Sequence, residues 1–194
     1  KNISGLWIVQ ECRREWQAMG EDFDYDQLTH MAREATPFIA SIDVDDPVFS
    51  SMGDMPRKIE QQCKASGQSI PCSKNETIRT ALEGLALKYR QVLENLRSQT
   101  GKSLEQIHIV GGGTKNELLN QMTADSTGCE IIAGPIEATS VGNILVQMIA
   151  TGEISSLTEG RQLVRESFEP KRYQPHHSEQ WEEAYQTMRS LNQV

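Results

Sequence analysis

The 194-residue chain is long enough for one domain with a sizeable core. Its formal net charge of −8 at pH 7 argues against a surface that binds nucleic acid or an anionic membrane. No apolar run approaches the roughly 20 residues of a membrane span, so we expect a cytoplasmic protein without a membrane segment or a cleaved leader.

The first residue is Lys1 rather than Met, and a helical pattern follows almost at once. Leu6, Val9 and Trp16 are spaced along one side of a helix predicted over residues 4–19. A start of this kind is typical of the interior of a longer polypeptide, and we expect the chain to be one part of such a protein.

Residues 21–75 have weak periodicity, several prolines and the acidic run "DVDDP". Short helix-like pieces such as "YDQLTHMAREA" lie between them. We interpret this region as an irregular insert with short helices. The segment "FIASIDVDDPVF" within it is compatible with a strand or with an extended loop.

The chain has 4 cysteines, none of them in a CxxC pair or at zinc-ligand spacing from a histidine, so no metal site is predicted. Cys63 and Cys72 bracket "KASGQSIP" and could meet across a turn. The alternative, favoured by the cytosolic character of the chain, is a set of reduced and mostly buried thiols.

The clearest helix is predicted over residues 76–99. One apolar stripe runs along it at three- and four-residue steps: Ile78, Leu82, Leu85, Tyr89, Val92 and Leu96. Ser73 and Glu76 match an S-x-x-E capping box at its start, and Gly101 suits its end.

The next pattern predicts a strand, a helix, a strand and a helix over residues 106–111, 116–126, 129–134 and 137–151. This βαβα order predicts two parallel strands with a right-handed crossover. The first strand, "QIHIVGG", is almost wholly apolar, which is typical of a strand that is covered on both faces.

Two further helices are predicted over residues 156–167 and 178–191. A two-stranded parallel sheet is a poor core by itself, because most sheets have more strands. We therefore expect missing strands upstream. The bare strand edge could also mediate self-association.

Gly111, Gly112 and Gly113 lie where the first strand gives way to the following helix. Glycines there allow the backbone to approach a ligand, and a helix N-terminus favours an anion. Ligands of open α/β sheets also bind at the carboxyl ends of strands, so a nucleotide site is predicted. The alternative is a tight turn, because the run matches neither the Rossmann nor the Walker motif.

The stretch "HIVGGGTKNELLNQMTADSTGCEIIAGPIEATSVGN" resembles the adenosine-binding segment of the FGGY carbohydrate kinases. The residues that match the family pattern are Gly111, Gly112, Asn116, Leu119, Gln121, Ala124, Asp125, Gly128, Glu137, Ala138, Thr139, Gly142 and Asn143. Within the family, "NISGLWIVQ" and "IIAGPIEATSVGNI" resemble the branch that phosphorylates L-rhamnulose. Kinases of other ketoses, such as fuculose or xylulose, are alternatives, as is a non-catalytic α/β interaction module.

The resemblance implies an α/β fold: a partial RNase H-like (actin-like ATPase) lobe with a short parallel sheet, a helical insert and C-terminal helices. Residues 1–194 would form a single partial domain, the second lobe of such a kinase. Residues 106–151 would be its adenosine-binding βαβα unit.

The resemblance also implies roles for individual residues. The implied ATP-binding residues are Gln10, Gly111, Gly112, Gly113 and Asn116. The Asn116 side chain can both donate and accept hydrogen bonds, as an adenine edge requires. Asn2 matches an asparagine that contacts the sugar. The structural alternatives are an N-cap role for Asn116 and an exposed helix position for Gln10.

Other polar and small residues are interpreted as structural. Asp125 is assigned to packing and capping, and Glu137 to the favourable interaction of a carboxylate with a helix N-terminus. Gly142 and Ala138 are expected to let their helix pack closely on the sheet. His108, within the first strand, is expected to be a core histidine.

The family's catalytic base and its D-x-G phosphate turn belong to the first lobe, and no matching D-x-G-[ST] segment is present in this sequence. No catalytic residue and no metal ligand is therefore predicted here. The implied cofactors are ATP and Mg²⁺, with the metal held mainly by missing parts, and the implied partners are ATP and L-rhamnulose. The isolated chain is expected to be inactive and to bind ATP weakly.

Overall fold

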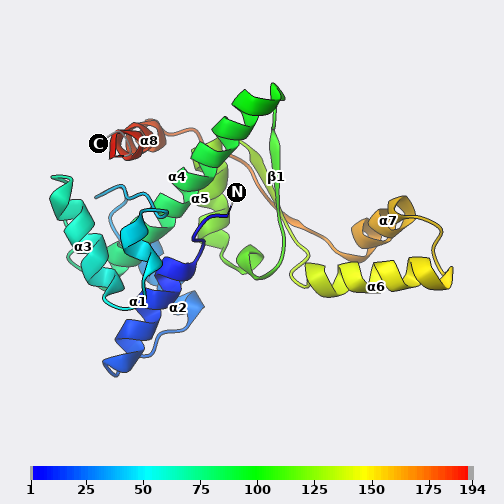
Figure 1. Cartoon of the computed structure of the whole chain (residues 1–194), viewed down its shortest axis with the longest axis horizontal. Helices are drawn as coiled ribbons and strands as arrows, with labels where there is room; N and C mark the ends of the chain where they lie inside the picture. The colour runs from blue at the N-terminus through cyan, green and yellow to red at the C-terminus, as the bar shows by residue number, and fades with distance from the viewer. Residues whose placement is uncertain (1, 192–194) are drawn as a thin grey trace.

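The computed structural model describes residues 2–191, which form an α/β structure with a small sheet (Figure 1). The helices are α1 (Trp7–Ala18), α2 (Tyr25–Glu34), α3 (Met55–Ala65), α4 (Lys74–Thr100), α5 (Glu117–Thr127), α6 (Ala138–Thr151), α7 (Leu157–Ser167) and α8 (Glu179–Leu191), with 3-10 helices η1 (Pro47–Ser50) and η2 (Gly112–Lys115). No helix in this described range is long and apolar enough to span a membrane. The six helices predicted outside residues 21–75 are all present, as α1 and α4 to α8.

The sheet has three strands in the order β1-β2-β3. The strands are β1 (Gln106–Ile109), β2 (Glu130–Ala133) and β3 (Lys171–Tyr173). β1 and β2 are parallel, with Ile107 opposite Ile131, which confirms the predicted parallel pairing through an intervening helix. β3 was not predicted and pairs with β2 in the antiparallel direction, so the sheet is mixed. Its three residues, "KRY", are too few to show a strand period.

β1 is an edge strand, and its residues alternate between exposed and half-buried. The predicted cover on both faces is therefore wrong for this chain, and His108 is exposed rather than part of the core. An open, mainly apolar cavity lies between β1 and the C-terminal half of α4 and includes Val92, Leu96 and Ile107 in its lining.

α4 is the central helix of the structure, and α1, α2, α5 and α8 all pack against it (Figure 1). Its N-terminal half is fully buried at Ile78, Leu82 and Leu85. The Ser73 hydroxyl accepts the backbone N–H of Glu76 at 3.2 Å, as predicted. The Glu76 carboxylate, however, accepts the N–H of Cys72 at 2.7 Å, so the predicted capping box is only half formed.

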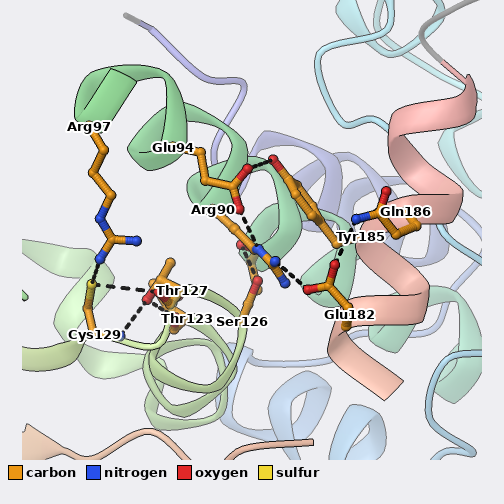
Figure 2. Close-up of polar contacts among 11 residues, drawn as sticks. Arg90, Glu94, Arg97, Thr123, Ser126, Thr127, Cys129, Glu182, Tyr185 and Gln186 are labelled. Carbon is orange, nitrogen blue, oxygen red and sulfur yellow. Dashed lines mark hydrogen bonds and ion pairs between the residues drawn. The ribbon is translucent and has the colours of Figure 1, made fainter. Parts of the chain in front are cut away.

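α8 is attached to α4 through a polar cluster (Figure 2). The Arg90 guanidinium donates to Glu94 at 2.9 Å, pairs with Glu182 and lies over the Tyr185 ring at 4.1 Å from its centroid. The Tyr185 hydroxyl donates to Glu94 at 2.7 Å. Burial and the neighbouring carboxylate of Glu94 raise the pKa of Tyr185, so its hydroxyl stays a donor.

Residues 21–75 contain α2, η1 and α3, in agreement with the predicted short helices. The segment "FIASIDVDDPVF" forms a loop and η1, not a strand. This loop is packed on α4: Ile42, Val44 and Phe49 are fully buried, and Asp43 forms an ion pair of 2.9 Å with the buried Lys88. Apolar burial and a buried charge pair thus fix a segment that has no regular hydrogen-bond pattern.

α6 and α7 form an arm that projects away from the other helices (Figure 1). Leu145 is the buried residue of α6, whereas Ile144 and Val146 are 56% and 64% exposed. A Cβ added at Gly142 would have no heavy atom within 4 Å, so the predicted close packing of this helix on the sheet is wrong. The contact partner of α6 is α7 instead.

All four cysteines are free thiols, which confirms the alternative of reduced and mostly buried cysteines. Cys12, Cys63 and Cys129 are buried, and Cys72 is exposed. Burial raises the pKa of Cys63 to about 11, so this thiol stays protonated and unreactive at neutral pH.

Two helical glycines allow opposite predictions for the same substitution. A Cβ at Gly84 of α4 would lie 2.9 Å from the Ile42 side chain and 3.0 Å from its carbonyl oxygen, whereas Gly142 of α6 faces open space. We expect Gly84→Ala to destabilise the fold by about 1–3 kcal/mol through overpacking. Gly142→Ala should stabilise it by roughly 0.5–1 kcal/mol, because alanine loses less backbone entropy. Urea unfolding of both variants measures the difference, and equal signs would contradict the packing described.

Candidate nucleotide site

Gly111 forms the turn between β1 and η2. Its φ of +80° lies in the region that favours glycine, and its N–H donates to the Pro135 carbonyl at 3.1 Å. Its carbonyl accepts both the N–H of Thr114 at 3.1 Å and the Thr114 hydroxyl at 2.7 Å. The positive φ of this turn therefore favours glycine at residue 111 whether or not a ligand binds.

Gly112 and Gly113 differ from Gly111 in this respect. Neither has a positive φ. A Cβ at Gly112 would meet nothing within 4 Å, and one at Gly113 would meet only Ile109, at 3.9 Å. The fold does not demand glycine at Gly112, and the space beside its backbone is open. This is the geometry that close approach of a ligand would require.

A cavity of about 350 Å³ opens beside this loop, within the size range typical of small-molecule sites. Its lining comes from α1 and its N-cap, from α2, from α4 and from the glycine loop, and consists of Leu6, Val9, Gln10, Tyr25, Asp26, Leu28, Thr29, Ile78, Leu82, Gly112, Gly113, Lys115 and Asn116. The fold thus brings Gln10 together with Gly112, Gly113 and Asn116, which are far away in the sequence. Asn2 is exposed and is not among the lining residues.

Asn116 has two roles in the geometry. Its Oδ1 accepts the N–H of Leu119 at 2.9 Å, so it is the N-cap of α5. It also lines the cavity, where its Nδ2 group can still donate to a ligand. The two interpretations from the sequence are therefore compatible. The buried Asn120 steadies the loop by donating from Nδ2 to the Thr114 carbonyl at 2.9 Å.

Gln10 is exposed on α1 while it lines the cavity. Its backbone N–H donates to the Leu6 carbonyl at 2.9 Å as part of the helix. Its side chain has no hydrogen-bond partner among the residues that the structure describes, so the amide is available to a ligand.

The wall formed by α2 was missed by the sequence analysis. Tyr25, Asp26 and Thr29 all line the cavity from the region interpreted as an irregular insert. Tyr25 is 49% exposed, and its ring centroid lies 5.3 Å from Cζ of the Arg13 guanidinium. The Asp24 and Gln27 capping box, with bonds of 2.7 and 2.8 Å, marks the start of α2. That signal locates the helix, but it does not indicate which loop the helix faces.

The side chains present do not form a magnesium site. Between residues 2 and 191 no group of three or more His, Cys, Asp or Glu residues is placed to hold a metal. Asp26 is the one carboxylate in the cavity lining, and hard cations such as Mg²⁺ need several oxygen ligands.

The sequence of residues 1–151 matches the model of the FGGY family of carbohydrate kinases, C-terminal domain. The chain therefore belongs to this family of sugar kinases. Its α/β fold agrees with the class predicted from the sequence.

Two curated relatives are rhamnulokinases. The one from Bacteroides thetaiotaomicron is 40% identical over 185 residues, which covers 95% of this chain and 37% of that protein. The one from Bacillus subtilis is 40% identical over 175 residues, covering 90% of this chain and 36% of that protein. The chain thus spans little more than a third of the length of the relatives that it matches.

Solved structures of kinases also resemble the chain. Plasmodium falciparum glycerol kinase, a structure with ADP, has a TM-score of 0.64 at 18% identity, covering 96% of this chain and 36% of the kinase chain. At this level of identity the comparison shows a shared fold.

The two roles of Asn116 can be separated by substitution. Asn116→Asp keeps an N-cap oxygen but removes the Nδ2 donor, so the free energy of unfolding should change by less than about 0.5 kcal/mol. If Asn116 donates to an adenine base, affinity for ADP should fall about tenfold, the expected effect of losing one hydrogen bond. Asn116→Ala should lose both the affinity and about 1 kcal/mol of stability. Calorimetry with ADP and urea unfolding measure the two effects, and unchanged ADP affinity in both variants would exclude a contact with the base.

Proposed function

We propose that the chain is the ATP-binding part of the second lobe of a kinase that phosphorylates L-rhamnulose to L-rhamnulose 1-phosphate. The observation that carries the proposal is the single cavity lined by Gln10, Gly112 and Asn116, in which Gly112 presents bare backbone to open space. These are the residues expected to contact ATP. The rhamnulokinase relatives favour L-rhamnulose as the sugar.

In this proposal the adenine base enters the cavity between the glycine loop and α2. Leu6, Val9 and Leu82 supply apolar contacts, and Asn116 and Gln10 supply amides for the edge of the base. The exposed ring of Tyr25 offers an aromatic face against which the base or the ribose can pack. The chain's contribution is then to hold the nucleotide, which suits a reaction that depends mainly on positioning.

The proposed reaction is a phosphoryl transfer. The sugar hydroxyl oxygen forms a bond to the γ-phosphorus, the bond from that phosphorus to the β,γ-bridging oxygen breaks, and the hydroxyl proton passes to a general base. The products are ADP and the sugar phosphate. We assign the base, the metal and most sugar contacts to parts of the longer protein outside this chain. A cytoplasmic location is included in the proposal, because that compartment keeps thiols reduced.

Kinase activity should require those other parts. We expect no ADP release by the isolated chain with Mg·ATP and L-rhamnulose, and turnover by the full-length parent, measured with a coupled ADP assay. ADP should bind to the isolated chain with a Kd of roughly 0.1–1 mM, because much of the contact surface is absent. Turnover by the isolated chain would contradict the proposal. A parent that is active only with L-fuculose or D-xylulose would identify another ketose kinase.

Gly112→Val distinguishes a nucleotide site from a simple turn. The new side chain would point into open space, so the fold should be retained while the cavity is partly filled. We expect ADP affinity to fall at least about tenfold in calorimetry, with an unchanged circular dichroism spectrum. Full ADP affinity in a folded variant would favour the alternative of a non-catalytic interaction module.

A further inference from the structure

α5 carries a polar stripe that the proposed function does not use. Glu117, Gln121 and Asp125 are spaced by four residues and therefore lie on one side of the helix. Gln121 and Asp125 are part of the motif matched to the kinase family, and Asp125 was expected only to pack and cap. The structure gives this stripe a different partner, the segment 171–176 near the end of the chain.

Each residue of the stripe contacts the segment 171–176, and successive residues of the stripe contact successive residues of the segment. Glu117 pairs with Lys171, and the Gln121 side-chain amide donates to the Gln174 carbonyl at 2.9 Å. The Asp125 carboxylate accepts the backbone N–H of His176 at 2.7 Å.

The contacts made by Gln121 and by Asp125 are linked by further hydrogen bonds. Gln121 Nε2 also donates to Asp125 Oδ1 at 2.8 Å, and His176 Nδ1 lies 3.0 Å from Gln121 Nε2 and 3.4 Å from Asp125 Oδ1. The Asp125 side chain is only 16% exposed, whereas that of His176 is 77% exposed, so the cluster lies at the surface with its carboxylate turned inward.

The segment is connected to the glycine loop by two routes. The first is α5 itself, because Asn116 is both its N-cap and a cavity residue. The second is the sheet: Lys171 pairs with Ala133 of β2, and Pro170 lies 3.6 Å from the position of a Cβ at Gly134. The neighbouring Pro135 carbonyl accepts the N–H of Gly111.

We propose that residues 171–176 act as a strap that holds α5 and the glycine loop in the nucleotide-binding arrangement, with Gln121 and Asp125 as positioning residues. Neither side chain is in the cavity lining, so both act through the position of α5. The inference rests on the proposed function, because it assigns a role in binding the nucleotide at that same cavity. If the strap favours the binding arrangement, nucleotide must in turn favour the closed strap, since coupling between sites is reciprocal.

The test compares one substitution at two places in the full-length protein. Gln121→Glu replaces the donor to Gln174 with a carboxylate that faces the Gln174 carbonyl and Asp125. Gln162→Glu on α7 is the matched control, because Gln162 also donates to an acid four residues later, Glu166, at 2.9 Å, but lies away from the strap. Gln121→Met, which removes the donor without adding a charge, replaces the first variant if that variant does not fold.

Three readouts are measured: ADP affinity by calorimetry, the KM values for ATP and for the sugar, and hydrogen exchange of residues 171–178 with and without ADP. We expect Gln121→Glu to weaken ADP binding and raise the KM for ATP about tenfold, with an unchanged KM for the sugar. ADP should slow exchange of the strap in the wild type and in Gln162→Glu, but not in Gln121→Glu. A purely structural role would not make exchange depend on ADP.

Two results would overturn this inference alone. The first is unchanged ADP affinity in Gln121→Glu or Gln121→Met. The second is hydrogen exchange of the wild-type strap that is the same with and without ADP. Equal losses for ATP and sugar together with a lower melting temperature would also overturn it, in favour of general destabilisation. A wild-type protein that does not bind ADP would overturn the proposed function, and the strap with it.

Discussion

The packing of both halves of the chain on α4 is the constraint on which the candidate site depends. The loop within residues 21–75 buries Ile42 and Val44 against this helix beside Gly84. α5 is packed against it as well, with the Ser126 hydroxyl donating to the Ala86 carbonyl at 3.0 Å. α4 therefore holds the α2 wall and the glycine loop at a fixed separation. Ile78 and Leu82 of the same helix line the cavity between them, so the element that stabilises the core also shapes the site.

The three consecutive glycines have different physical reasons to be glycine. Gly111 has a positive φ, its carbonyl accepts the turn bond from Thr114, and its N–H donates to Pro135, so the backbone conformation itself favours glycine there. Gly112 is in ordinary backbone conformation beside empty space, so its lack of a side chain matters to whatever enters the cavity. Within the three glycines, Gly111 thus serves the fold and Gly112 serves the proposed ligand. The strap on α5 would add control over this loop without entering it.

Two apolar surfaces of the chain are left open. The free edge of β1 adjoins an apolar cavity beside α4. On α6, Ile144 and Val146 are exposed although the apolar side of a helix is normally buried. The chain spans about 37% of the length of the rhamnulokinase from Bacteroides thetaiotaomicron. The free edge of β1 is the place where further strands could pair, and the completion of the sheet by strands upstream stays a prediction.

The sequence by itself determined the helices with a clear apolar period, the parallel βαβ crossover, the turn at Gly111 and the residues matched to a kinase family, because these depend on local spacing. It could not determine β3, which is three residues long and exists only because β2 offers an open edge. Nor could it place Tyr25 and Thr29 opposite Gly112, or show that Gln121 and Asp125 bind the end of the chain. Those juxtapositions join segments far apart in the sequence. They are set by how α2, α5 and the C-terminal segment pack around α4 and the sheet, which local periodicity does not encode.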